Sequence, residues 1–467
     1  MVGEYSPNPL AAFPVEVAQQ VLAHCHPWDV ATFSKTCRAA YALVYLSSDQ
    51  YLWRQLYLNH FDGPQLEAHR SAKNTTSINW KEEVTTRLSI ELALFFGPTG
   101  FEEQRNTFRK LITVLHESSN IVAPSPAAAL NRGWIRHIVL DSNILSTLYS
   151  VSLPKRNENK QLLARLRSYL CLTVDPKEDE ATFELLNQRR NASRAFVYDL
   201  RNYTAKTNYG PFRKDGTVDW IHVDNIISVI SMNIRELPGS WASTRPPSIL
   251  DEPTANVSGP TDASAPTWPF NDWAGVQGTW RRYVCFMDYR DLFAFNFTDL
   301  ADGPLNIKFF ADPMFREAIR LIEVQLELIP SHSMRFHTLP EINWTQNPNF
   351  PPLCFKGVSK GVNGNEATVE GYVFMGKDDT VRWQMTSIYD ARPQWSSSGV
   401  QVGGVKSTTG VVGAWTTTHH DEGRHEMTLD SLGKLLTFST RTPDDPAGPF
   451  WLWKVEDGSP THLMEFT

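Results

Sequence analysis

Residues 10–57 read LAAFPVEVAQQVLAHCHPWDVATFSKTCRAAYALVYLSSDQYLWRQLY. Phe13-Pro14 opens the stretch, and proline is well tolerated at a helix start because the N–H that it lacks has no partner there. Apolar residues at helical spacing predict three short helices, the first through Val17 and Leu22, the second from Pro27 and the third along 33–44. Isolated helices shorter than roughly 12–15 residues are marginal in water. We therefore expect this stretch to pack against a partner, the next domain, or both.

The same stretch carries a series of features in a fixed order. They are a leading Leu10, an aromatic-Pro pair at Phe13-Pro14, an acidic Glu16, an aliphatic helix ending in Leu22, a Trp-Asp-Val step at 28–30, a Cys-Arg pair at Cys37-Arg38 and a Leu-Trp-Arg close at 52–54. In this order the features resemble the F-box motif, with Phe13 in place of the usual Leu. The resemblance covers about a tenth of the chain.

The resemblance implies that a three-helix F-box, within residues 8–60, binds the Skp adaptor of a cullin-RING ubiquitin ligase while the remaining chain recruits a protein substrate. The adaptor-binding residues that it implies are Leu10, Phe13, Pro14, Val17, Leu22, Trp28, Val30, Phe33, Cys37 and Trp53. Trp53 fits the core of the module equally well. The alternative interpretation is that residues 10–57 are only the helical start of a larger domain.

Length and composition limit the class of protein. A chain of 467 residues predicts two to three domains, and a formal net charge of −7 gives no basic field that would favour nucleic acid or an anionic membrane as a partner. No window is apolar enough for a membrane-spanning helix, and residues 1–10 do not follow a secretory-signal pattern. The five cysteines form no CxxC pair, which favours reduced thiols in the cytoplasm or nucleus over a disulfide framework or a zinc site.

The chain after residue 60 divides into three parts by composition. We expect a helical support domain at 75–237, a linker rich in Pro, Ser and Thr at 238–269, and an antiparallel β-domain at 270–467. Helical periodicity predicts helices over 80–96, 102–116, 134–151, 162–172, 181–186 and 223–234. In the first of these, the expected buried face is formed by Val84, Leu88, Leu92 and Phe95.

The pattern changes to strands after residue 273. Strands are predicted over 281–286, 292–297, 322–328, 354–358, 368–375, 381–387, 400–403, 411–418, 424–429, 435–439 and 450–455. So many short strands predict an antiparallel barrel or sandwich, and the fold class is therefore α+β and multidomain. Gly278-x-Trp280 resembles the opening of a lipocalin barrel. The block 395–413 and the segment 448–453 resemble the β-barrel region of some fungal F-box proteins.

Large rings and arginines on these strands are the candidate substrate contacts. We expect such contacts from Arg281, Arg382, Trp395, Trp415 and Trp451. Trp and Arg are favoured anchors at interfaces, and Arg pairs well with acidic or phosphorylated segments. The alternative is that the tryptophans fill the barrel and that the arginines are surface charges.

The sequence predicts neither a catalytic site nor a metal site. The His-rich cluster at 419–425 matches no spacing typical of zinc ligands. Ser398 lacks the flanking glycines of a nucleophile elbow, and the glycines at 403–404 lack the spacing of a phosphate loop. We therefore expect a non-enzyme without a cofactor.

Two classes of function remain. The F-box resemblance implies a non-catalytic substrate receptor that binds the Skp adaptor, and through it a cullin, and that acts by holding a target close to the conjugating enzyme. The alternative is a small-ligand-binding or enzymatic β-barrel tethered to the Skp adaptor, or a Skp-bound protein without a ubiquitin-ligase role. An enclosed apolar cavity with converging polar groups would favour the ligand-binding alternative, whereas a barrel filled by Trp and Phe would oppose it.

Overall fold

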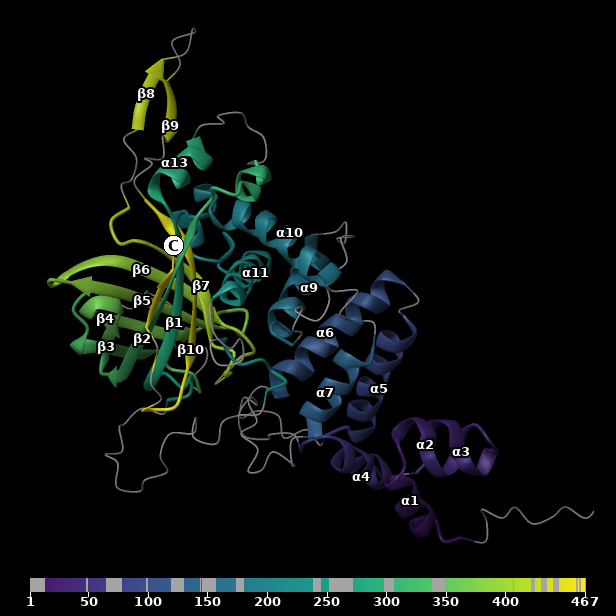
Figure 1. Ribbon diagram of the computed structural model, residues 1–467. Coiled ribbons are helices and arrows are strands. Elements are labelled where there is room, and N and C mark those ends of the chain that lie inside the picture. Colours follow the sequence, from purple (N-terminus) through teal and green to yellow (C-terminus); the bar gives the residue numbers. More distant parts are fainter. Residues whose placement is uncertain are drawn as a thin grey trace, which may run out of the picture. The chain divides into compact units, whose positions relative to one another are not determined.

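The computed structural model describes residues 13–47, 49–63, 78–97, 100–118, 130–142, 144, 157–173, 180–237, 245–251, 272–297, 306–337, 349–405, 407–420, 425–429, 435–439, 445–458, 461 and 463–466. Contacts within the chain divide it into two compact units, Met1–Leu153 and Pro154–Thr467 (Figure 1). This division falls inside the helical range predicted for 75–237. Most of the expected linker at 238–269 lies outside the described residues.

The first unit is helical. Its helices are α1 (Val15–Ala23), α2 (Pro27–Ser34), α3 (Arg38–Tyr45), α4 (Tyr51–His60), α5 (Trp80–Phe96), α6 (Phe101–Ser118) and α7 (Leu130–Leu140). The single helical face predicted along 33–44 is wrong, because α2 ends at Ser34 and α3 begins at Arg38. Cys37 caps α3 instead of lying on it, since its sulfur accepts the N–H of Ala40 at 3.4 Å. Cys37 therefore interrupts the apolar periodicity that a single helix would need.

A shared core holds these helices together. α1 packs on α4, α2 on α3 and α5, and α5 on α4, α6 and α7. The core is built from aliphatic side chains that are at most 8% exposed: Leu22, Val30, Val44, Leu52, Leu56, Val84, Ile90, Leu111, Ile135 and Ile138. Burial of one such side chain contributes about 1.5–3 kcal/mol, so short helices that are marginal alone are stable when packed together.

The buried face predicted for α5 is only partly correct. Val84 is buried, but Leu88 is partly exposed and Leu92 is 47% exposed. The structure buries Val84, Arg87, Ile90, Glu91, Ala93 and Leu94 instead. α5 contacts α2 and α4 as well as α6 and α7. A helix with neighbours on several sides buries more than one stripe, and its polar residues then need partners inside.

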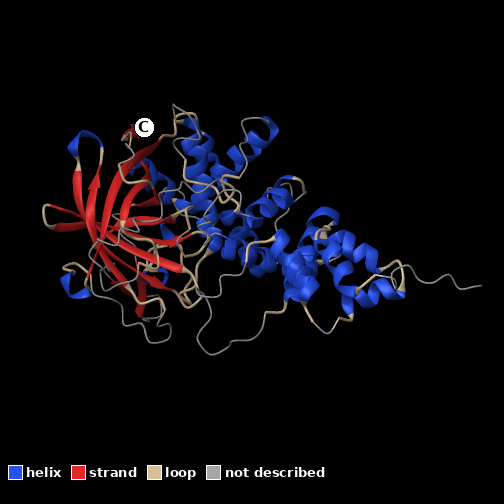
Figure 2. Cartoon of the chain, turned by 90° about the horizontal axis from the view of Figure 1, so that it is seen from below, coloured by secondary structure: helices blue, strands red, loops and turns tan. Residues whose placement is uncertain are grey.

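The second unit contains a closed antiparallel β-barrel. Its strands are β1 (Gly278–Met287), β2 (Glu317–Ile329), β3 (Leu353–Lys360), β4 (Glu366–Met375), β5 (Val381–Tyr389), β6 (Arg392–Gln401), β7 (Val411–Thr417) and β10 (Ala447–Lys454). Each pairs with the next, and β10 pairs with β1, so the eight strands form a ring (Figure 2). Trp280 marks the closure, since it lies opposite Val324 of β2 and Lys454 of β10. The α+β class and the barrel are thereby confirmed.

Within the described ranges, three further strands lie outside this ring. β8 (His425–Leu429) and β9 (Leu435–Ser439) form a two-stranded sheet of their own. β11 (Met464–Phe466), which was not predicted, pairs with β2 at 319–321. β6 begins at Arg392, well before the strand predicted over 400–403. The serines at 396–398 give no apolar signal from which the strand could be predicted, although Ser397 and Ser398 are buried.

Side chains fill the interior of the barrel. The core cluster there includes Trp280, Leu326, Phe355, Val373, Trp383, Met385, Trp415, Phe450 and Leu452. The rings of Trp280 and Trp383 meet edge to face with centroids 5.2 Å apart. Such contacts are typical of a packed core.

Helices cover part of the outer wall of the barrel. The described helices of this unit are α9 (Asn157–Tyr169), α10 (Glu180–Val197), α11 (Trp220–Glu236) and α13 (Tyr289–Phe297), and short 3-10 turns lie between its elements at Leu200–Asn202, Ala205–Thr207, Ile307–Ala311, Ser331–Ser333 and Val362–Gly364. α11 packs on β7 and β10, and α9 and α10 pack on α11 (Figure 1). Arg194 of α10 pairs with the buried Glu317 of β2 at 2.7 Å. This ion pair fixes the helices to the barrel.

The strand predicted over 292–297 is wrong, because these residues belong to α13. The alternation of phenylalanines in this window fits a strand, but burial follows a helical step from Leu292 to Phe295. The side-chain amide of Asn296 donates to the carbonyl of Leu292 at 2.8 Å, and its oxygen accepts the N–H of Leu200 at 3.0 Å. A window of six residues is too short to separate the two periods, and contacts with a distant segment decide between them.

Candidate functional site

An exposed apolar stripe runs along α1. Val17 and Val21 lie one turn apart on α1 and are 47% and 61% exposed, and Phe13, which lies two residues before the start of the helix, is 60% exposed. The opposite side of the helix buries Gln19 and Leu22. We call Phe13, Val17 and Val21 the α1 face. An amphipathic helix that presents apolar residues to solvent at this spacing has the form of a docking element.

Aromatic residues of α3 and α4 lie beside α1. The hydroxyl of Tyr51 donates to the side-chain oxygen of Gln20 at 2.7 Å, which ties the start of α4 to α1. Tyr51 is 40% exposed. On α3, Tyr41 is 51% exposed and its ring contacts that of Tyr45, which in turn contacts Trp53.

The residues predicted for adaptor binding fall into distinct classes of exposure. Leu10 lies outside the described residues. Phe13, Pro14, Val17 and Cys37 are exposed, Trp28 and Phe33 are partly buried, and Leu22, Val30 and Trp53 are buried. The indole N–H of Trp53 donates to the carbonyl of Val44 at 3.1 Å, so this ring serves the core. Adaptor binding itself stays a prediction for all of them.

A buried carboxylate, which the sequence pattern does not reveal, joins three helices. The indole N–H of Trp28 (α2) donates to Oε2 of Glu91 (α5) at 2.5 Å, and that of Trp134 (α7) donates to Oε1. Glu91 is 4% exposed. In the sequence, Glu91 belongs to the polar face of an amphipathic helix. Only the packing of α2 and α7 around α5 places it inside.

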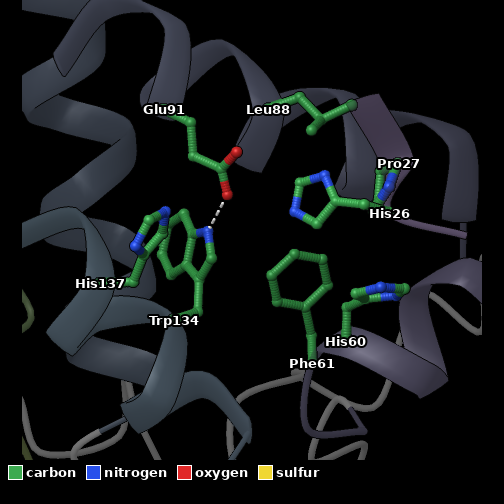
Figure 3. A pocket seen from close by; sticks show the side chains of 8 residues that line it. All are labelled: His26, Pro27, His60, Phe61, Leu88, Glu91, Trp134 and His137. Carbon is green, nitrogen blue, oxygen red and sulfur yellow. Dashed lines mark hydrogen bonds between the residues drawn. The ribbon is translucent and has the colours of Figure 1, made fainter. Parts of the chain in front are cut away.

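Glu91 borders a pocket of about 200 Å³ (Figure 3). The lining is His26, Pro27, His60, Phe61, Leu88, Glu91, Trp134 and His137. Nδ1 of His60 donates to the carbonyl of Leu56 at 2.9 Å, and Nδ1 of His26 accepts the backbone N–H of Trp28 at 3.3 Å. In each of these two rings, Nδ1 is therefore paired with the backbone. In the part of the chain that the structure describes, no group of three potential metal ligands occurs.

The nearest basic residue on α5 has other partners. Arg87 is 1% exposed, and its guanidinium pairs with Glu83 at 2.8 Å and donates to the hydroxyl of Tyr57 at 3.0 Å. The same group stacks over the rings of Tyr57 and Phe61. Among the described residues, no cation lies within 4.0 Å of the Glu91 carboxylate.

The predicted substrate contacts of the second unit lie in different surroundings. Arg382 is 4% exposed. Its guanidinium forms an ion pair with Asp378 at 2.5 Å and donates to the carbonyl of Gly216 at 3.2 Å. Burial raises the pKa of Asp378, but the charge of Arg382 and the hydrogen bonds to the carboxylate outweigh burial and lower it. Trp451 is fully buried and donates to the carbonyl of Thr409 at 2.7 Å. The contacts of Arg382 and Trp451 are those of structural residues.

The remaining predicted contacts are less enclosed. Arg281 is partly exposed, and its Nε donates to the hydroxyl of Thr461 at 3.3 Å. The rings of Trp395 and Trp415 meet edge to face at 5.3 Å, with Trp395 partly exposed and Trp415 9% exposed. The structure thus brings Trp395 and Trp415 together but does not join the five predicted residues into one site.

A buried guanidinium lies within the barrel. Arg282 is 5% exposed, donates to the hydroxyl of Ser397 at 2.7 Å and stacks over the ring of Phe450. Burial lowers the pKa of Arg282 to about 10. Its Nε has no hydrogen-bond partner, and the described residues place no carboxylate against it.

The His-rich cluster is only partly described, since residues 421–424 lie outside the described ranges. His420 stacks on Tyr209 with ring centroids 3.4 Å apart and lies 3.4 Å from the carboxylate of Asp445.

Comparison of the chain with protein-family models, with curated proteins and with solved structures finds no match. In the described ranges, no helix is long and apolar enough to cross a membrane.

Proposed function

We propose that the chain is an F-box-type substrate receptor that binds a Skp adaptor through α1 and its neighbours and holds a target protein with the second unit. The order of sequence features in 10–57 motivates the proposal. The α1 face carries it: Val17 and Val21 are exposed one turn apart on α1, and Phe13 is exposed just before the helix begins. Burial of apolar side chains against a partner is the main favourable term of such an association.

The proposed role requires no catalytic residue in this chain. Transfer of ubiquitin would be carried out by other subunits, and the receptor would raise the local concentration of target lysines near them. The filled interior of the barrel supports a protein-binding role over the small-ligand alternative, because Trp280, Trp383 and Phe450 occupy the space that a ligand would need. The compartment that goes with this role is the cytoplasm or the nucleus.

The test is binding of the full chain to an immobilised Skp adaptor. A variant with Phe13→Ala, Val17→Ala and Val21→Ala should bind at least about 100-fold more weakly, since three buried apolar side chains are each worth about 1.5–3 kcal/mol. The matched control carries Leu92→Ala and Leu140→Ala, whose side chains are 47% and 48% exposed outside the motif. It should bind as the wild type does.

Circular dichroism of each variant checks that the helices are intact. Failure of the wild-type chain to bind, or equal binding of the α1 variant and the wild type, would refute the docking role. A second assay asks whether a cullin is captured only when the adaptor is present. Capture supports the ligase role, whereas adaptor binding without cullin capture favours a Skp-bound protein of another kind.

A further inference from the structure

The pocket beside Glu91 differs in two features from an ordinary packing defect. One is a charged group that is 4% exposed at its wall, and another is a volume of about 200 Å³. A cavity of about 150 Å³ accommodates benzene, so the space suits a group of several heavy atoms. The pocket lies wholly within the first unit. It does not depend on the proposed F-box role.

The Glu91 carboxylate in the pocket wall favours a ligand with a positive charge. A buried carboxylate is costly unless it is paired or hydrogen-bonded. Glu91 has two hydrogen bonds, from Trp28 and Trp134, but no cation within 4.0 Å among the residues that the structure describes. Each carboxylate oxygen has two lone pairs, so one on each oxygen stays open for another N–H donor. An anion would be repelled here, whereas a cation would complete the charge balance.

The rest of the lining suits an organic cation on an apolar stem. Phe61 and Trp134 place aromatic rings in the lining, and cations are attracted to such rings (Figure 3). Leu88 and Pro27 offer apolar surface for a stem. A bare metal ion fits less well, because the described residues offer no group of three ligands.

We propose that this pocket binds an alkylammonium group, with Glu91 as its counter-ion and the rings of Phe61 and Trp134 beside it. Two sources carry this group: a free small amine and a lysine side chain. An ammonium donates up to three hydrogen bonds, and the open lone pairs of the Glu91 carboxylate can accept them.

The experiment follows the indole N–H resonances of Trp28 and Trp134 in the ¹⁵N-labelled full chain. Trp28→Phe and Trp134→Phe assign the two resonances. Titration with n-butylammonium chloride should shift both saturably, while n-butanol, its neutral analogue, should bind at least about tenfold more weakly because it lacks the charge. Sodium chloride at equal ionic strength controls for salt.

A pair of variants on α5 separates pocket binding from surface effects. Leu88→Phe fills the pocket and leaves Glu91 in place, so it should abolish the saturable shift. Leu92→Phe is the control, since Leu92 lies one turn further along the same helix, is 47% exposed and does not line the pocket. Glu91→Gln should weaken n-butylammonium binding by at least about tenfold, because it removes the counter-ion.

Capped lysine and capped norleucine form the second arm. Saturable binding of capped lysine, but not of capped norleucine, assigns the pocket to a protein side chain. Binding of n-butylammonium alone assigns it to free amines. The proposal is overturned if neither cation shifts the two indole resonances saturably, if n-butanol matches n-butylammonium, or if Leu88→Phe leaves binding unchanged.

Discussion

The indole Nε1 of Trp28 lies 2.5 Å from Oε2 of Glu91, a residue 63 positions later in the chain. The other oxygen of the same carboxylate accepts the indole N–H of Trp134. One buried side chain therefore fixes α2 and α7 to α5. Hydrogen bonds to charged groups contribute about 1.5–3 kcal/mol each, so this arrangement is a large fraction of the stability of a small helical unit.

Trp28→Phe should lower the free energy of unfolding by about 1.5–3 kcal/mol, because it removes one donor to a charged acceptor. Glu91→Leu should cost more, since it leaves both indole N–H groups without their acceptor. Urea unfolding followed by circular dichroism measures both. In a double-mutant cycle the two changes should be non-additive. Additive effects would show that the two side chains do not act together.

Two buried arginines of the barrel should respond in opposite ways to the same substitution. Arg382→Met leaves Asp378 without its ion-pair partner and should cost up to about 3–5 kcal/mol. Arg282→Met removes a buried charge that has a hydroxyl partner and no carboxylate among the described residues. It should be neutral or stabilising. Thermal unfolding of the two variants beside the wild type is the measurement, and equal destabilisation would contradict the prediction.

The buried His222 should make the second unit sensitive to acid. Burial lowers the pKa of His222 from 6.5 to about 4, and the ring is hydrogen-bonded to the Tyr203 hydroxyl at 3.2 Å. Because the unfolded chain binds the proton more readily, stability from this group is complete above pH 6.5 and is lost as the pH falls towards about 4. The loss is about 3 kcal/mol at most.

His222→Gln should remove this contribution to the pH dependence. The measurement is the difference in unfolding midpoint between pH 7 and pH 5, which should be smaller in the variant than in the wild type. An unchanged difference would mean that other groups account for the acid sensitivity.

Gly410 should not tolerate a side chain. Its φ is +90°, and an added Cβ would lie 2.1 Å from the carbonyl oxygen of Leu452 and 2.9 Å from the Cα of Trp453. Gly410→Ala should therefore disturb the pairing of β7 with β10 and lower the melting temperature markedly. Gly364 is the control, because its φ is +72° but nothing lies within 4 Å of an added Cβ. Gly364→Ala should cost about 1 kcal/mol, the ordinary cost of positive φ.

The elements that the sequence predicted well have strong local signals. The helix over 80–96 matches α5 at both bounds, since Asn79 caps its start and Gly97 follows its last residue. The strict alternation of 322–328 lies within β2. β6 was predicted only in part, because its buried positions include Ser397, Ser398 and Gly399, which carry no apolar signal.

The pocket could not be predicted, because its lining comes from four segments that only folding brings together. Glu91 has the same sequence context as an exposed glutamate on an amphipathic helix, and nothing local reveals two tryptophans aimed at it. The reverse holds for Trp451 and Arg382, whose residue types suggested an interface. The indole N–H of Trp451 is already bonded to Thr409 and the guanidinium of Arg382 to Asp378, so these groups are not available to bind a partner.

β7 and β10 are neighbours in the ring although 29 residues separate Thr417 from Ala447. β10 is held on both edges, by β7 at one and by β1 at the other, through hydrogen bonds that do not depend on covalent continuity between the strands. A chain cut between Thr417 and Ala447 would therefore keep its ladders, and the two fragments should reassemble as a split protein. The same position suits the insertion of a reporter domain, since the barrel closes without it.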